Sequence, residues 1–157
     1  MLLYLVRHPE PLGGHGRCYG RTDLAVHPRS VERTVAALRV PMIADDLQEM
    51  DFGAWEGRPW AQIPRDELDA WARDVWCHAP GGGESAGMVA QRWQRWIAQR
   101  AAAGGSAVAV THAGVIRVAL ASSRVPDAGD VAIMRIAFGA VYRIDMEGGG
   151  ERPCAGS

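Results

Sequence analysis

The chain has 157 residues, of which 48% are hydrophobic and 22% are charged. This balance is typical of one globular domain and excludes a wholly disordered chain, a collagen and a coiled coil. Seventeen basic residues stand against 18 acidic ones, a net charge of -1, so no basic excess indicates a nucleic-acid partner. We expect a domain at residues 1–146 and a glycine-rich tail at residues 147–157.

Every basic residue is an arginine, because the sequence contains no lysine. A Schiff-base lysine and a Walker-type phosphate-binding lysine are therefore excluded. If the protein binds phosphate, it must use arginine, histidine, backbone N–H groups or a metal ion.

The cysteines and the apolar runs bear on where the protein is located. Cys18, Cys77 and Cys154 are far apart and form no Cys-x-x-Cys pair, so we expect reduced thiols and a cytoplasmic protein. The apolar run before Arg7 is too short for a signal peptide or a membrane span, and charges interrupt every later run. We therefore expect no contact with a membrane.

Hydrophobic periodicity and helix-capping residues predict strands that alternate with helices. In chain order we expect a buried strand at Leu2–Val6, a loop at 7–27, a helix from Pro28, an irregular segment at 40–58, a helix from Pro64 with an apolar stripe that reaches Trp76, a helix capped by Ser85 and ended by Gly104, a strand at Ala107–Val110, a helix from Ala113, and strands at Val131–Ile136 and Ala140–Ile144. This order favours a layered α/β fold.

Two of the predicted strands run directly into a histidine. Arg7 and His8 follow the first strand, and His112 follows the strand at Ala107–Val110. Ligands bind at the carboxyl ends of strands in open α/β sheets, and His112 also opens a helix, whose N-terminus attracts anions. Two imidazoles, an arginine and a helix N-terminus would form a phosphate site without lysine.

Two other interpretations of these histidines remain open. A strand-end histidine is often purely structural, although the repeated arrangement favours a functional role. A zinc site is the second alternative, but no His-x-His pair, His-x-x-x-His pair or cysteine cluster lies nearby to supply further ligands.

A third candidate is Glu49, in a segment where glycines and aromatic residues surround several acidic ones. Such a segment favours a tight, partly buried loop, where a carboxyl group can serve as a general acid. The alternative is that Glu49, Asp51 and Glu56 are solvated loop charges, and spacing alone favours that alternative.

Five stretches together resemble the histidine phosphatase (phosphoglycerate-mutase-like) superfamily, and most of all its alpha-ribazole phosphatase group. They follow the family's order over most of the chain and comprise Leu3–His8, Cys18–Leu24, Leu47–Gly57, Gly82–Ser85 and Thr111–Arg117. The resemblance implies a three-layer α/β/α fold with a mostly parallel sheet. It also implies a phosphatase that needs no metal or cofactor and acts on a small phosphorylated metabolite.

The resemblance assigns a role to each matched residue. His8 would be the nucleophile that becomes phosphorylated, Arg7 would bind the phosphoryl oxygens, and His112 would donate a hydrogen bond to the same group. Glu49 would protonate the leaving alcohol and then assist water. The N–H group of Gly114, at the start of the helix after His112, would be a further phosphate donor.

The sequence departs from the family pattern in two places. Pro9 replaces the glycine that usually follows the nucleophile. In addition, the family has a strand and a helix with a second phosphate-binding arginine before Glu49, and here that unit is missing near 40–44. Arg29 and Arg33 are possible substitutes, although a solvated helix face explains both more simply.

Two functions follow. The first is a phosphomonoesterase that acts through phosphohistidine on alpha-ribazole phosphate or a cobalamin phosphate. The second is a truncated relative that binds phosphorylated ligands without turnover. The six tryptophans also allow a homodimer through aromatic faces that the shortened domain leaves uncovered.

Overall fold

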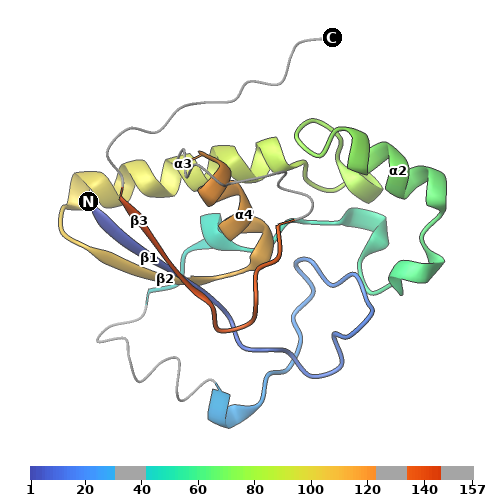
Figure 1. Ribbon diagram of the computed structural model, residues 1–157, viewed down its shortest axis with the longest axis horizontal. Helices are drawn as coiled ribbons and strands as arrows, with labels where there is room; N and C mark the ends of the chain where they lie inside the picture. The colour runs from blue at the N-terminus through green and yellow to red at the C-terminus, as the bar shows by residue number, and fades with distance from the viewer. Residues whose placement is uncertain (31–41, 123–133, 146–157) are drawn as a thin grey trace.

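The computed structural model describes residues 1–30, 42–122 and 134–145 (Figure 1). Its strands are β1 (Leu2–Arg7), β2 (Ala107–Thr111) and β3 (Val141–Asp145), and its helices are α2 (Arg65–Arg73), α3 (Ala86–Ala103) and α4 (Ala113–Ser122). Four 3-10 turns lie at Asp45–Leu47, Gly53–Trp55, Trp60–Gln62 and Pro80–Gly82. The expected α/β fold is confirmed.

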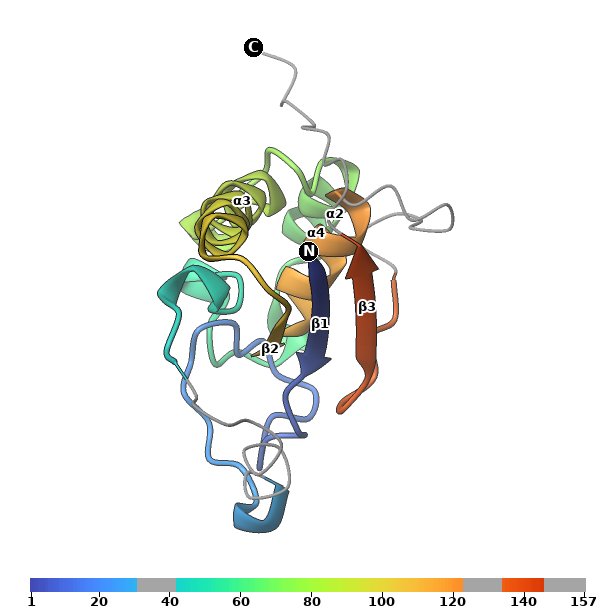
Figure 2. The same cartoon turned by 90° about the vertical axis from the view of Figure 1, so that its left-hand side faces the viewer.

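The described strands form one small sheet in the order β2-β1-β3, and Figure 2 shows β1 and β3 side by side and pointing in opposite directions. β1 pairs with β2 in parallel, with Arg7 opposite Thr111, and with β3 in antiparallel. The sheet is therefore mixed, whereas the sequence predicted a mostly parallel one. Because β3 pairs antiparallel with β1, its start lies beside the end of β1 that carries Arg7.

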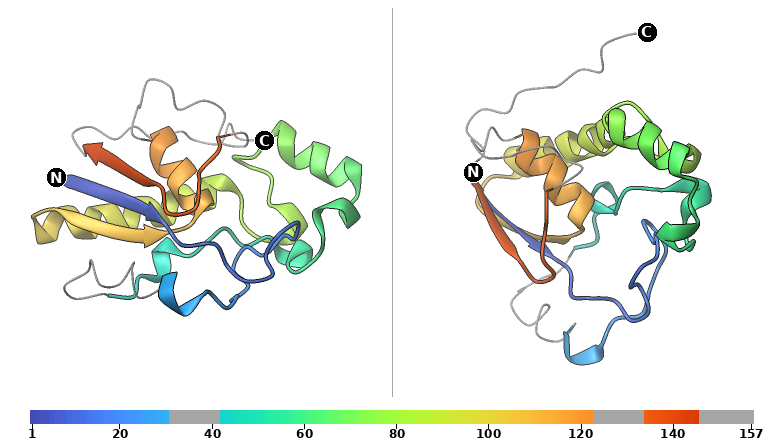
Figure 3. Two further views of the ribbon diagram at one scale, coloured as in Figure 1. Left: turned by 60° about the horizontal axis from the view of Figure 1, so that its bottom comes forward. Right: turned by 45° about the vertical axis from the view of Figure 1, so that its right-hand side comes forward.

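One face of this sheet holds the core. Leu3 and Leu5 of β1 are fully buried, and they belong to one cluster with Val89 of α3 and Val115 and Ile116 of α4. Figure 3 shows α3 and α4 together over one side of the strands. Burial of five such side chains contributes about 1.5–3 kcal/mol each to folding.

The opposite face is less covered. Val108 of β2 is 51% exposed and Val141 of β3 is 62% exposed, and both share the face of Tyr4 and Val6, their cross-strand partners. The sequence predicted that β1 is buried on both faces. It is fully buried on the face of Leu3 and Leu5 and partly buried on the face of Tyr4 and Val6. The sequence predicted a three-layer α/β/α fold. Among the described residues, α3 and α4 form one helical layer, on the face that carries Leu3 and Leu5.

A groove of about 480 Å³ runs along β2 on the side away from β1. Four consecutive residues of that strand line it, together with Trp96 of α3 and the exposed Met42 and Ile43. The described residues between Pro28 and Glu49 contain no strand, which agrees with a histidine phosphatase fold shortened by one strand–helix unit.

Two expected elements differ from the structure. The apolar stripe from Leu68 to Trp76 extends past the end of α2, because the helix stops at Arg73 and Asp74 is non-helical. The expected strand at Val131–Ile136 is wrong for Met134–Ile136, which is irregular. The carbonyl groups of that segment bind arginine side chains instead, and residues 131–133 lie outside the described part.

The cysteines follow the expectation in part. Cys18 is a buried free thiol, whereas Cys77 is disulfide-bonded, so the expectation of three reduced thiols is wrong for Cys77. Cys154 and the tail at residues 147–157 lie outside the described residues. No helix in the described part is long and apolar enough to cross a membrane, and the cytoplasmic location stays a prediction.

The predicted cap of α3 is confirmed, because the Ser85 hydroxyl accepts a hydrogen bond from the Met88 N–H at 3.3 Å. Replacing a serine N-cap by alanine costs about 1 kcal/mol, so Ser85→Ala should lower the unfolding midpoint in a thermal or urea titration. Ser106→Ala, at an exposed loop position, is the control. Equal midpoints for the two variants would contradict the capping role.

Candidate active site

The parallel pairing of β1 and β2 brings the two strand-end histidines together. His8 follows β1 and donates its backbone N–H to the Thr111 carbonyl at 2.9 Å, and His112 is the next residue after Thr111. The two imidazole centroids are 4.8 Å apart, with the ring planes tilted by 57°. The sequence prediction that these histidines share one site is met.

A backbone carbonyl orients the ring of His8. Its Nδ1 lies 2.6 Å from the Pro9 carbonyl oxygen, which can only accept a hydrogen bond. Nδ1 must therefore carry the proton, so the lone pair of the neutral ring is on Nε2. Pro9, where the family usually has glycine, thus supplies the group that sets this tautomer.

Both imidazoles stay neutral at lower pH than an ordinary histidine. Burial lowers the pKa of His8 below 6.5, and Arg7 lowers it further, against opposing effects of the Pro9 carbonyl and Glu49. The pKa of His112 is also lowered, chiefly by burial and less by His8 and Arg92, against the opposing charge of Glu49. A neutral His8 can act as a nucleophile near pH 7.

Arg7 is held beside these rings by aromatic and backbone contacts. Its guanidinium carbon lies 3.6 Å from the centroid of the Phe138 ring, and its Nη1 donates to the Ile136 carbonyl. Burial raises the pKa of the nearby Tyr19 hydroxyl, and the positive charge of Arg7 opposes this increase. The Arg7 Nε is buried and has no partner in the described structure. The guanidinium thus keeps a donor for which a bound anion is a suitable acceptor.

Glu49 joins the site from the irregular segment after the 3-10 turn at Asp45–Leu47. Its carboxylate accepts hydrogen bonds from the Met50 N–H at 2.9 Å and from the Gly114 N–H at 3.1 and 3.2 Å. The carboxylate is thus anchored at the N-terminus of α4, close to His112. The interpretation of Glu49 as a solvated loop charge does not fit this half-buried placement.

Gly114 holds Glu49 in this structure. The sequence assigned its N–H to a phosphate, but that N–H donates to the carboxylate. A Cβ atom on residue 114 would lie closer to the Glu49 Oε1 than any nonbonded contact allows. The backbone of α4 and the carboxylate can therefore approach only because this residue is glycine.

Sequence reasoning gave no role to Arg117, although the family motif included it. Arg117 of α4 donates its Nε to the Met134 carbonyl at 2.7 Å, while Arg7 binds the Ile136 carbonyl two residues away. Burial lowers the pKa of Arg117. The negative charge of Glu49 opposes this decrease, and the positive charge of Arg7 adds to it. The sequence held one signal for a role of Arg117, because this residue follows Gly114 by about one helical turn.

Of the two expected substitutes for the missing arginine, the structure describes only Arg29. Arg29 is exposed and lies in a short helical segment at residues 28–30. Arg33 lies outside the described residues. No group of three histidine, cysteine, aspartate or glutamate side chains in the described part is placed to hold a metal ion.

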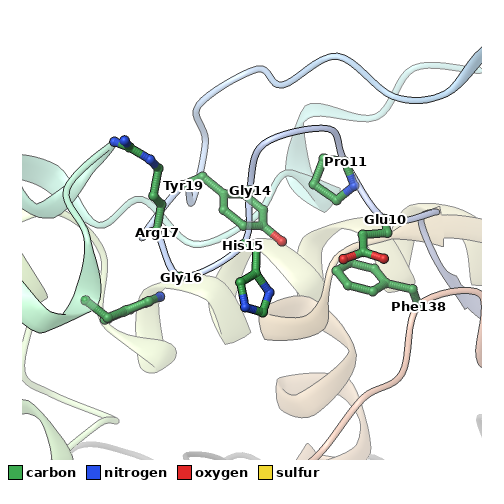
Figure 4. Close-up of a pocket in the computed structure, with 9 residues that line it drawn as sticks. Glu10, Pro11, Gly14, His15, Gly16, Arg17, Tyr19 and Phe138 are labelled. Carbon is green, nitrogen blue, oxygen red and sulfur yellow. The ribbon is translucent and has the colours of Figure 1, made fainter.

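A pocket of about 220 Å³ adjoins the site through shared side chains (Figure 4). Tyr19 and Phe138 line it, and Phe138 also contacts Arg7. Phe138 also lies edge-on to His8, with centroids 5.7 Å apart. Trp60 adds a third aromatic side chain, and the polar part of the lining comes from Glu10, His15 and Arg17. The pocket can therefore hold a group with both apolar and polar parts.

Solved structures share this fold over nearly the whole chain. The protein TTHB049 of Thermus thermophilus is 27% identical, with 93% of this chain and 94% of that chain covered and a TM-score of 0.72. A phosphoglycerate mutase of the same organism has the same identity, coverage and TM-score. The mycobacterial glucosyl-3-phosphoglycerate phosphatase Rv2419c is 23% identical, with 90% of this chain and 91% of that chain covered and a TM-score of 0.75.

No curated protein matches the sequence. The family model of the histidine phosphatase superfamily (branch 1) matches residues 29–153. This match contains Glu49 and His112, and the parallel pairing of β1 and β2 adds Arg7 and His8 beside them. The chain belongs to the histidine phosphatase superfamily, branch 1.

Proposed function

We propose that the protein is a metal-independent phosphomonoester hydrolase that forms a phosphohistidine on His8. The observation that carries this proposal is the His8–His112 pair, in which the Pro9 carbonyl leaves the Nε2 of His8 unprotonated. An oriented neutral imidazole beside an arginine is what nucleophilic attack on a phosphomonoester requires.

In the first step, the Nε2 of His8 attacks the phosphorus atom, and the bond between phosphorus and the alcohol oxygen breaks. Glu49 gives its proton to that oxygen, so the leaving group departs as a neutral alcohol. Charge spreads over the three equatorial oxygens of the phosphoryl group, where the guanidinium of Arg7 and an N–H of His112 stabilise it.

In the second step, a water molecule attacks the phosphorus atom and the bond to Nε2 breaks. The Glu49 carboxylate takes the proton of the attacking water, and inorganic phosphate leaves. His8 returns to its neutral tautomer, with the Nδ1 proton still directed at Pro9. Glu49 is thus ready for the next turnover.

We propose alpha-ribazole phosphate or a cobalamin phosphate as the substrate. Three aromatic side chains line the pocket beside the phosphate site, and they fit a leaving group with a planar aromatic part. The polar lining from Glu10, His15 and Arg17 fits the hydroxyl groups of a sugar.

A second candidate function is binding of phosphorylated ligands without turnover. The observation that favours it is the exposed position of Arg29, which leaves the second phosphate-binding arginine of the family without a substitute there. Removing one transition-state donor typically costs about 2.7–4 kcal/mol, so turnover is expected to be slow when Arg7 alone supplies that contact.

The test of the proposed function is hydrolysis of p-nitrophenyl phosphate in the presence of EDTA. We expect turnover that EDTA does not inhibit and that His8→Ala abolishes. Arg29→Ala is the control, because Arg29 is exposed and we expect it to retain full turnover. Activity that survives His8→Ala contradicts the proposal. Phosphate that raises the unfolding temperature without any turnover supports the binding function.

The lowered pKa of His8 and His112 predicts how both rings titrate. NMR titration of the imidazole resonances should give midpoints below 6.5, with the assignment taken from His8→Asn and His112→Asn. The unfolded chain binds these protons more readily, so the histidine contribution to stability is complete above about pH 6.5 and decreases as the pH falls through the folded pKa values. Midpoints at or above the ordinary histidine value would contradict the account of burial.

The aromatic pocket predicts a difference between substrates. Trp60→Ala should raise the KM for a phosphate ester with an aromatic leaving group by about 3- to 10-fold, the loss expected for one aromatic contact, and leave the KM for glycerol phosphate unchanged. Trp71→Ala is the matched control, because the Trp71 ring stacks on Trp60 but does not line the pocket. The same KM change for both esters would exclude the pocket as the leaving-group site.

A further inference from the structure

We propose that Arg92, held by Glu84, is the positioning residue for the general acid Glu49, and this inference rests on the proposed function. Arg92 lies on α3, outside the residues that sequence reasoning placed in the site. It contacts neither histidine by a hydrogen bond in the described structure. Three of its hydrogen bonds go instead to the chain segment that carries Glu49.

All five N–H groups of the Arg92 guanidinium have partners. Two of them bind the Glu84 carboxylate, from Nε at 3.0 Å and from Nη2 at 2.9 Å. The other three donate to backbone carbonyls of the Glu49 segment, those of Asp46 at 2.8 Å, Gln48 at 2.7 Å and Glu49 at 3.1 Å. Arg92 is only 4% exposed, so water does not compete for these bonds.

The one carbonyl in this run that Arg92 does not bind has a buried partner of its own. The hydroxyl of Thr111, the last residue of β2, donates to the Leu47 carbonyl at 2.7 Å. The consecutive carbonyls at residues 46–49 are thus all fixed by side chains from α3 and from the strand that leads to His112. The backbone of Glu49 is held in a fixed relation to His112.

The other end of Glu49 is anchored independently. Its carboxylate accepts hydrogen bonds from the N–H groups of Met50 and Gly114. Arg92 therefore fixes the backbone of this residue, and α4 fixes the carboxylate. If Arg92 releases the backbone, the carboxylate no longer lies at one place relative to the leaving oxygen, and a displacement of about 1 Å is enough to impair proton transfer.

Glu84 keeps Arg92 in place. Burial would raise the pKa of Glu84, but hydrogen bonds from Arg92 and from the Asp51 N–H outweigh it and lower the pKa. The carboxylate therefore stays charged beside the guanidinium at neutral pH. Arg21 adds a weaker second contact, because it binds Glu84 at 2.9 Å and the Glu49 carbonyl at 3.4 Å but is 38% exposed.

Loss of a positioning residue changes the ratio of the turnover rates of two substrates, whereas loss of a merely structural residue does not. A poor leaving group must receive a proton from Glu49, whereas p-nitrophenolate departs without one. Loss of general-acid catalysis therefore lowers turnover of an alkyl phosphate far more than turnover of p-nitrophenyl phosphate. The ratio of the two rates in one sample is independent of the fraction of folded protein.

The experiment compares this ratio, phenethyl phosphate over p-nitrophenyl phosphate, in wild type and variants. Glu49→Gln removes the general acid and should therefore give the largest decrease of this ratio, about 10²- to 10⁴-fold. Arg92→Lys keeps the charge but replaces the five donors of a guanidinium with the three of an ammonium, and we expect it to lower the ratio about 10-fold. Glu84→Gln, which keeps the size of the side chain, should lower the ratio in the same direction.

Arg95→Lys is the matched control. Arg95 is on the same helix and also binds Asp46, through the carboxylate at 2.9 Å, but its side chain is 60% exposed, and we expect no change in the ratio. An unchanged ratio in Arg92→Lys and Glu84→Gln, with hydrolysis by the wild type still dependent on His8, overturns the inference alone. Absence of His8-dependent hydrolysis in the wild type overturns the proposed function and this inference with it.

Discussion

The parallel pairing of β1 with β2 is the constraint on which the rest of the structure depends. It places Arg7 opposite Thr111, so the residues that follow, His8 and His112, leave the sheet at the same edge. A register shift of one residue would turn each side chain of a strand to the opposite face. The burial of Leu3 and Leu5 on one face therefore fixes the geometry of the histidine pair.

Around this pair, backbone carbonyls are the main partners of the arginine side chains. Arg7 and Arg117 bind the carbonyls of Ile136 and Met134, and Arg92 binds three carbonyls near Glu49. A buried arginine is costly unless its donors are satisfied, and irregular segments supply unpaired carbonyls. The irregular chain at 134–136 and the segment at 46–49, which begins within a 3-10 turn, thus hold the arginine charges beside the site.

Most of the strands and helices that position the site could be predicted from the sequence, since each has a local signal. The apolar run of β1, the Ser85 cap of α3 and the glycine after it are such signals. The pairing of His8 with His112 followed from the rule that strand ends meet at one sheet edge. The contacts of Gly114 and Arg92 with Glu49 could not be predicted, because they join segments that are 65 and 43 residues apart in the chain.

The measurement that tests the central claim most directly is the identification of the phosphorylated residue during turnover. Wild-type protein is mixed with an aryl phosphate, quenched in alkali within the first turnover, and mapped by mass spectrometry. Our account predicts one phosphoryl group on the peptide with His8, lost in His8→Ala and longer-lived in Glu49→Gln. Turnover without a phosphopeptide, or a phosphoryl group on His112 in place of His8, would contradict it.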